Sequence, residues 1–285
     1  MTPGARIRAL ADRVAHEEGS TRPVALVRIG IALILWSRFG SDFAVFAHRP
    51  SWLWLLLGAS FFASTLAMLV GFRARAASAW VAATLGTIIG YFGVVGGNHD
   101  YLHHHVSLLL ILCILLALAP CGGSYSVDRW LAVRAAERTG IGPPPERARL
   151  WAQWLICLQV SAIYFWGAID KTYPGYLSGE RMQHFILFFD LGSSYPRSAL
   201  FAPLAQVSAL LSVALEYVLA FGLWSRRWQR WLIPTGIVFH GVIYFTMPVV
   251  TFTVTTWLLY VLFIPPDVVH RALDRVSGAY GENVG

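Results

Sequence analysis

The chain has 285 residues, of which 56% are hydrophobic and only 13% are charged, and its mean hydropathy is +0.57. This balance excludes an ordinary soluble domain and is typical of a protein that crosses a membrane several times. The net charge of +7 does not indicate nucleic acid as a partner, because the basic residues lie between apolar runs and form no separate basic module.

The first 23 residues are polar, and they lead into the first apolar run. Apolar side chains recur here at helical spacing among arginines, which favours a short amphipathic helix on the membrane surface. The apolar positions are Ile7, Leu10, Ala11 and Val14, and the arginines are Arg6, Arg8 and Arg13. The apolar run after them lacks the small-residue cleavage site of a signal peptide, so we expect no cleavable signal here. We expect residues 1–23 to be a cytoplasmic segment, because basic residues gather on their side of the predicted helices.

Eight apolar segments follow, and most of them approach the ~20 residues that cross a hydrocarbon core. They cover residues 24–40, 52–71, 76–96, 104–120, 151–169, 199–224, 231–247 and 249–264. The sequence therefore predicts an all-α, polytopic integral membrane bundle of about eight transmembrane helices. We expect one transmembrane domain over residues 24–265 and a cytoplasmic tail over 266–285. The first, seventh and eighth segments are short, so a count of six spans stays open.

Basic residues are unevenly divided between alternate loops. Most of the 22 Lys and Arg side chains lie in the N-terminal segment, in the loops at 72–75, 121–150 and 225–230, and in the C-terminal tail. The positive-inside rule then places both termini in the cytoplasm. It also places the loops that contain "GGNHDYLHHH" and "DKTYPGYLSGERMQHF" together on the non-cytoplasmic side, where they can meet. We expect a multi-pass protein of a bacterial cytoplasmic membrane.

Lys171 is the only lysine of the chain, and arginine occupies every other strongly basic position. A guanidinium stays protonated in proteins, whereas a lysine amine can lose its proton where burial disfavours the charge. This contrast indicates a base at the rim of an apolar helix. The alternative is a compositional accident, with a lone lysine extending to the membrane surface, and a charged pair with the adjacent Asp170 is also open.

A second polar group follows the third apolar segment. Asn98, His99, Asp100 and Tyr101 precede a run of three histidines, residues 103–105. His99 and His103 are four residues apart and would share one face of a regular helix, as metal-binding pairs do. No HExxH motif accompanies them, so we expect no metal and interpret His99 as a candidate for hydrogen bonding or proton transfer.

Two ionisable residues lie deep in later apolar segments, Glu216 in "LSVALEYVLAFGL" and His240 in "GIVFHGVIYF". A carboxyl group in hydrocarbon is costly unless it is paired or protonated, so each is expected to have a partner inside the bundle. Arg28 in the first helix is one candidate partner for Glu216. A structural ion pair and a contact with substrate both stay open.

These residues also carry a resemblance to a known family. The chain resembles the HTTM membrane domain shared by vitamin K-dependent gamma-carboxylases and their bacterial relatives. "YFWGAIDKTYPGYLSG" is similar to the family's catalytic segment, with Lys171 at the catalytic lysine, Tyr176 where a tryptophan is usual, and Gly179 at the glycine. "NHDYL" places His99 on a histidine of the carboxylation step, and "SVD", "ALEYVLAFGLWSRR" and "FHGVIYFTM" follow in the family's order.

The resemblance implies a reaction at Lys171 and His99. A free-base lysine would deprotonate a reduced naphthoquinone, which oxygen would convert to a strong base and an epoxide. That base would take a proton from a carbon of a small peptide or protein substrate, and the carbon would capture carbon dioxide. The residues expected to bind substrate are Asn98, Tyr101, Trp166, Tyr173, Tyr176, Glu216 and His240.

Three functional hypotheses follow. The first is a membrane enzyme in which a lysine base acts on a lipid-soluble quinol or a similar acid. The second is a non-catalytic accessory factor for the maturation or export of a small secreted peptide. The third is a transporter, which ranks lowest because the helices show no obvious inverted repeat.

Overall fold

The computed structural model describes residues 4–5, 12, 14–46, 52–192, 194–247 and 249–277. Helices dominate these residues, which confirms the predicted all-α class; a two-stranded sheet of three-residue strands is the exception. The chain divides into two compact units, which are described separately. The described residues up to Ile156 and from Ile264 onward form unit 1, and Cys157–Phe263 form unit 2.

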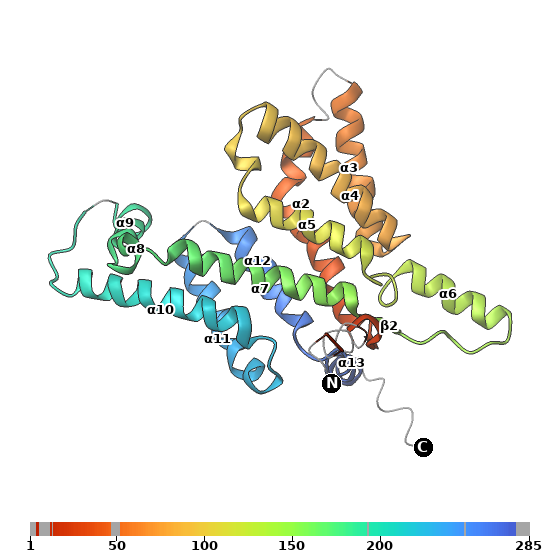
Figure 1. The fold of residues 1–285 in the computed structure, drawn as a ribbon. Helices are drawn as coiled ribbons and strands as arrows, with labels where there is room; N and C mark the ends of the chain where they lie inside the picture. Colours follow the sequence, from red (N-terminus) through yellow and green to blue (C-terminus); the bar gives the residue numbers. More distant parts are fainter. Residues whose placement is uncertain are drawn as a thin grey trace. The chain divides into compact units, whose positions relative to one another are not determined.

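Unit 1 is built on four packed helices, α2 to α5. Its elements are β1 (Glu18–Ser20), α2 (Arg22–Phe46), α3 (Trp52–Val70), α4 (Ala74–Ile88), the π-helix η1 (Ile89–Val95), the 3-10 helix η2 (His99–Tyr101), α5 (His104–Leu118), α6 (Val127–Arg138), β2 (Arg147–Arg149) and α13 (Pro266–Val276) (Figure 1). Helix α2 packs against α3 and α5, and α4 packs between α3 and α5. Helix α7 (Trp151–Lys171) begins in this unit and continues through unit 2.

The buried face of α2 explains why this segment packs as it does. Val27, Ile31, Leu35, Phe39 and Phe43 recur every four residues, and each is at most 1% exposed. Side chains four apart lie on one face of a helix, so these five form one continuous stripe. The Phe43 ring stacks on a phenylalanine of α3 with a centroid distance of 3.9 Å. Since lipid tails are as apolar as these side chains, close packing of this kind holds the helices together.

The polar end of unit 1 joins three distant parts of the chain. Strands β1 and β2 pair antiparallel, with Glu18 opposite Arg149. The Arg22 guanidinium, at the start of α2, contacts the Glu146 carboxylate at 2.6 Å and the Asp274 carboxylate of α13 at 2.5 Å. Helix α13 therefore rests on β1 and on the start of α2.

Unit 2 is organised around the long helix α10. Its elements besides α7 are α8 (Pro174–Leu177), α9 (Glu180–Phe189), α10 (Phe201–Gly222), α11 (Arg226–Thr246), α12 (Val250–Leu259) and the 3-10 helix η3 (Tyr260–Leu262). Helix α10 contacts α8, α9 and α11, and α11 contacts α12. Gly179 precedes α9 with a φ of +83°, and a Cβ there would lie 2.5 Å from the Gln206 backbone. A glycine at this position thus lets α9 begin directly against α10.

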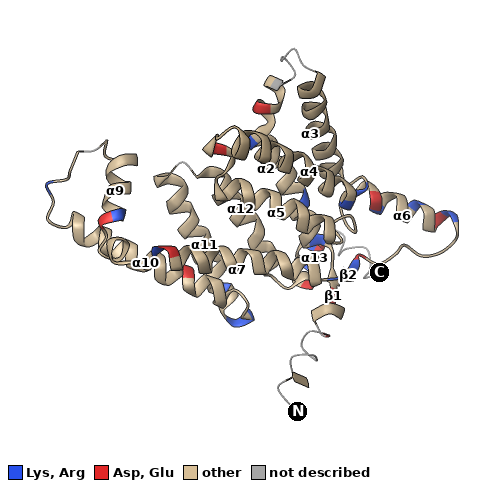
Figure 2. Ribbon diagram, turned by 45° about the horizontal axis from the view of Figure 1, so that its top comes forward, with Lys and Arg blue, Asp and Glu red and all other residues tan. Residues whose placement is uncertain are grey.

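Apolar helices confirm a multi-pass membrane protein, in coarser form than the sequence predicted. All eight apolar segments contain helix, but among the described residues five helices are by themselves long and apolar enough to span: α2, α3, α4 continued by η1, α7 and α10. Helix α5 has 15 residues, and α12 with η3 meets α13 at a 100° bend. Helices α3 and α12 contain no charged residue (Figure 2). The count of eight spans and the orientation of the termini stay predictions.

Three segments differ from the sequence interpretation or fall outside the description. The long basic loop at 121–150 contains helix α6 and strand β2, neither of which was expected, and the tail after residue 265 begins with helix α13. Of the seven apolar and arginine positions named for the predicted N-terminal amphipathic helix, only Val14 lies among the described residues, where it is helical and exposed. Ile7, Leu10 and Ala11, together with Arg6, Arg8 and Arg13, lie outside them.

Candidate functional site

The sole lysine of the chain is paired with a buried carboxylate. Lys171 is the last residue of α7, and its Nζ donates hydrogen bonds to both Glu216 carboxylate oxygens, at 2.6 Å and 2.8 Å. The Glu216 side chain is 10% exposed, whereas that of Lys171 is 32% exposed. The carboxylate is thus the inner partner, inside α10, and the amine is the partner that a ligand can reach.

This pair corrects two expectations about partners. Glu216 pairs with Lys171, and not with Arg28, which was the candidate from the sequence. Arg28 is fully buried in unit 1, where its Nη2 donates a hydrogen bond to the Tyr125 carbonyl at 2.5 Å. The carboxylate that holds Lys171 is Glu216 and not its neighbour Asp170, which is exposed.

The helix face that carries Lys171 has a gap at Gly167, one turn earlier. A Cβ at Gly167 would lie 3.6 Å from a Glu216 carboxylate oxygen and 3.7 Å from Lys171 Nζ. The glycine is therefore in contact with the pair, and its lack of a side chain leaves space beside the two charged groups. Tyr164 lies seven residues before Lys171, two turns back along α7, and so on the same side of the helix.

Tyr164 belongs to a second polar group, a buried chain of hydrogen bonds. Its hydroxyl lies 2.8 Å from His240 Nε2 on α11 and forms a short hydrogen bond with the Tyr260 hydroxyl on η3. All three side chains are at most 3% exposed. His240 Nδ1 is buried and has no hydrogen-bond partner among the described residues. Buried polar atoms without partners are rare in folded proteins, which makes His240 a candidate for a functional role.

Three aromatic residues expected near Lys171 have different environments. Trp166 is 61% exposed and Tyr173 is 45% exposed, so both offer aromatic surface outside the core. Tyr176 is buried, and its hydroxyl lies 3.1 Å from the Ser212 hydroxyl on α10. It packs with Ala209 and other apolar side chains of α8 to α10, which gives it a role in holding α8 against α10.

The histidine segment lies in unit 1, and its residues have structural partners there. Asn98 caps η2 by accepting a hydrogen bond from the Asp100 backbone N–H at 3.0 Å. The Tyr101 hydroxyl donates to the Asp42 carboxylate at 3.1 Å, and its ring stacks on Phe92. His99 is exposed and lies in η2.

The i, i+4 interpretation of His99 and His103 is wrong. His103 is the N-cap of α5, outside the 3-10 helix that contains His99, so the two do not share one regular helix. Among the described residues, no three His, Cys, Asp or Glu side chains form a group that could hold a metal ion. His99 and Lys171 belong to different units, and their meeting at one site stays a prediction.

Sequence reasoning missed Tyr164, Tyr260 and Gly167. A signal was present for Tyr164 and Gly167, because residues three, four and seven apart lie on one face of a helix, and both residues precede Lys171 at such spacings. Tyr260 carries no such signal, since its contact with Tyr164 depends on how η3 packs against α7. Comparisons with known proteins add no assignment: no family model, no curated protein and no solved structure matches the chain.

Proposed function

We propose that the chain is a membrane enzyme in which Lys171 takes a proton from a lipid-soluble acid, such as a quinol. The observation that supports this most is the double hydrogen bond from the Lys171 amine to the buried Glu216 carboxylate. Ionisable groups inside transmembrane segments are expensive and are candidates for function by default. The accessible Lys171 amine can receive a proton from a substrate, and the buried Glu216 carboxyl group stabilises the ammonium that forms.

The movement of protons follows from this pairing. When a ligand enters the site, the ammonium gives one proton to the Glu216 carboxylate, which leaves a neutral amine and a neutral carboxylic acid. This neutral form of the pair is favoured when the ligand excludes water, because an environment of low dielectric constant destabilises both the ammonium and the carboxylate. The amine then accepts the proton of the substrate O–H, and the substrate keeps the electron pair as an anion beside the ammonium.

The side chains around Lys171 fit an aromatic, lipid-soluble substrate. Trp166 on α7 and Tyr173, two residues after Lys171, present exposed aromatic surface, and α7 and α10 are long and apolar enough to span a bilayer. A reduced naphthoquinone is the acid that the sequence resemblance implies, and when bound it would supply the strong base needed to carboxylate a small peptide or protein. Trp166 and Tyr173 would hold the ring system, and His240 would exchange a proton from its buried Nδ1.

We place this site on the non-cytoplasmic side of a bacterial cytoplasmic membrane, with His99 serving the carboxylation step. The support is the distribution of basic residues between loops, which the positive-inside rule translates into orientation. Cysteine labelling decides the sidedness. A cysteine in place of exposed Ser178 should react with a membrane-impermeant maleimide on spheroplasts, and one in place of exposed Arg138 should react only after the membrane is opened.

The proposal is tested by turnover and by retained lipid. Purified protein in lipid nanodiscs should consume a reduced naphthoquinone in air faster than heat-denatured protein. Lys171→Arg should abolish the excess consumption while keeping the pairing with Glu216 and hence the unfolding temperature. Arg197→Gln, at an exposed position after α9, serves as the control. Organic extraction of the wild-type protein should yield a stoichiometric quinone, and full activity of Lys171→Arg would exclude the lysine mechanism.

A second candidate is a non-catalytic accessory factor that uses the same pair as a structural link between α7 and α10. The observation that favours it is that both Glu216 oxygens are satisfied by one amine at short distances. In that case Lys171→Arg is tolerated in function as well as in stability. The protein should then copurify with a partner protein and contain no quinone.

A further inference from the structure

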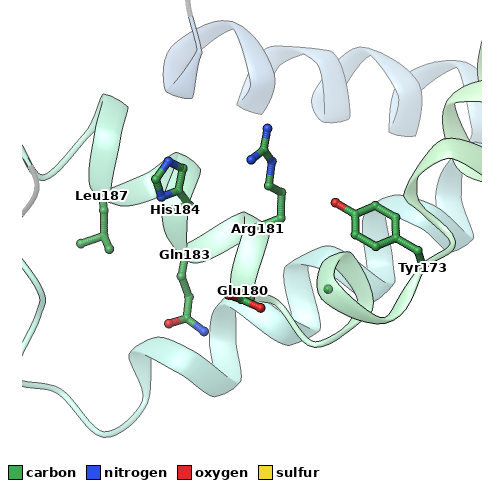
Figure 3. A pocket seen from close by; sticks show the side chains of 7 residues that line it. Tyr173, Glu180, Arg181, Gln183, His184 and Leu187 are labelled. Carbon is green, nitrogen blue, oxygen red and sulfur yellow. The ribbon is translucent and has the colours of Figure 1, made fainter.

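A pocket of about 430 Å³ lies on helices α8 and α9 of unit 2, just after Lys171. Figure 3 shows the polar side chains that line it. They are Tyr173, Glu180, Arg181, Gln183 and His184, with Leu187 at the apolar end. None of these residues takes part in the Lys171–Glu216 pair or in the buried tyrosine and histidine chain.

The position of the pocket in the chain places it at a membrane boundary. Helix α9 and its flanking turns connect the end of α7 to the start of α10, and both of these helices are candidate spans. The end of a span lies where hydrocarbon gives way to headgroups, and the pocket residue Tyr173 follows the last residue of α7 by only two positions. This location puts the pocket within reach of phospholipid headgroups.

The faces of α9 agree with an interfacial helix. Met182 and Phe185 pack against the core of α8 and α10. Phe188 is 66% exposed, Phe189 is 43% exposed, and Leu191 just after the helix is 41% exposed. Exposed apolar side chains beside a charged face are typical of helices that lie in the headgroup region. Acyl chains would cover this apolar surface.

The pocket carries groups of both charge signs. Arg181 and His184 offer N–H donors, and the Arg181 guanidinium lies 5.0 Å from the Phe185 ring centre, which steadies it. In the view of Figure 3, Arg181 and His184 extend to one side of α9, and Glu180 and Gln183 extend to the other. The Tyr195 hydroxyl donates to Gln183 Oε1 at 2.9 Å, so the amide nitrogen is the Gln183 group that can donate to a ligand.

We propose that this pocket binds the headgroup of a zwitterionic aminophospholipid, one with a phosphate and a primary ammonium. Arg181 and His184 bind the phosphate, since charge-assisted hydrogen bonds to phosphate favour arginine. The Glu180 carboxylate accepts hydrogen bonds from the ammonium. A purely anionic headgroup gains from Arg181 but is repelled by Glu180. A choline headgroup has no N–H to donate to the carboxylate.

Native mass spectrometry of the purified full-length protein tests the proposal. The protein is equilibrated with equal amounts of phosphatidylethanolamine, phosphatidylcholine and phosphatidylglycerol carrying the same acyl chains. We expect phosphatidylethanolamine to be retained about tenfold over the other two, which corresponds to about 1.4 kcal/mol. Arg181→Gln should lower the retention of all three lipids about tenfold. Glu180→Gln should lower that of phosphatidylethanolamine alone, and Arg197→Gln, outside the pocket, should change none.

The wild-type comparison decides the matter even if a variant fails to fold. Equal retention of the three lipids overturns the proposal, and so does a preference for phosphatidylglycerol, which would indicate a simple anion site. Soluble phosphoethanolamine should displace the retained lipid better than inorganic phosphate does. Equal displacement by inorganic phosphate would mean that only the phosphate is recognised, against the assigned role of Glu180. Because Lys171 takes no part, an inactive Lys171→Arg protein should retain lipid as the wild type does.

Discussion

Replacing Lys171 by methionine removes the only cation that the structure pairs with Glu216. Removing one partner of a buried ion pair costs about 3–5 kcal/mol, because the other charge stays buried without compensation. Here the cost is reduced, since Lys171 keeps about a third of its exposure and Glu216 can take up a proton. We expect a loss of about 2 kcal/mol at neutral pH, or about 4 to 8 °C in unfolding temperature.

A double-mutant cycle measures this coupling. Wild type, Lys171→Met, Glu216→Met and the double variant are unfolded by heat in the same detergent. Each single variant should be destabilised, and the double variant should recover about 2 kcal/mol relative to the sum of the two losses. The penalty of Lys171→Met should shrink as the pH falls and Glu216 becomes protonated. Additive losses that do not change with pH would refute the reasoning that the two groups form one buried pair.

Three further predictions follow from other contacts. Tyr164→Phe should cost about 1–3 kcal/mol in thermal unfolding, because it leaves both nitrogens of a buried imidazole without partners. Gly236→Ala should lower the free energy of unfolding by about 1–3 kcal/mol, since a methyl group there overlaps the Tyr260 hydroxyl. Gly241→Ala on the same helix is the control: its methyl group would lie 3.7 Å from the Trp257 ring, an ordinary contact, and stability should not change. The Arg22 guanidinium donates a hydrogen bond to the Asp274 carboxylate and thereby lowers the pKa of that carboxyl in the folded protein. The contact therefore stabilises the fold at pH values above the pKa that Asp274 has in the unfolded chain. This stabilisation is lost as the pH falls through the pKa of Asp274 in the folded protein. Amide protection of α13 by hydrogen exchange should therefore fall below about pH 4, and Arg22→Gln should remove that dependence.

The members of the candidate site were visible in the sequence, but their pairing was not. Lys171, Glu216 and His240 stand out because each is an ionisable side chain in an apolar segment. Lys171 and Glu216 are 45 residues apart in the chain, and hydropathy carries no information about how their two helices pack. Arg28 was as good a partner for Glu216 as Lys171 on charge alone. The structure separates them, because Arg28 is engaged with a backbone carbonyl of its own unit.

Helix positions were more predictable than local breaks. Apolar runs located the helices because a span needs apolar side chains along its whole length, facing either lipid or neighbouring helices. The histidine segment shows the limit: the chain unwinds after η1 and turns through η2 before α5 begins, which places His99 and His103 on separate elements. Helix α6 was missed because its arginines were interpreted as a loop signal, although Ser126 caps it by accepting from the Arg129 backbone N–H.

The joined polar end of unit 1 has a consequence for biosynthesis. Arg22 emerges from the ribosome 124 residues before its partner Glu146 and 252 residues before its partner Asp274. All of unit 2 is translated between those partners. Insertion into the membrane can thus start with α2, whereas the final closure of the first unit has to wait until α13 has been made, after all the intervening helices.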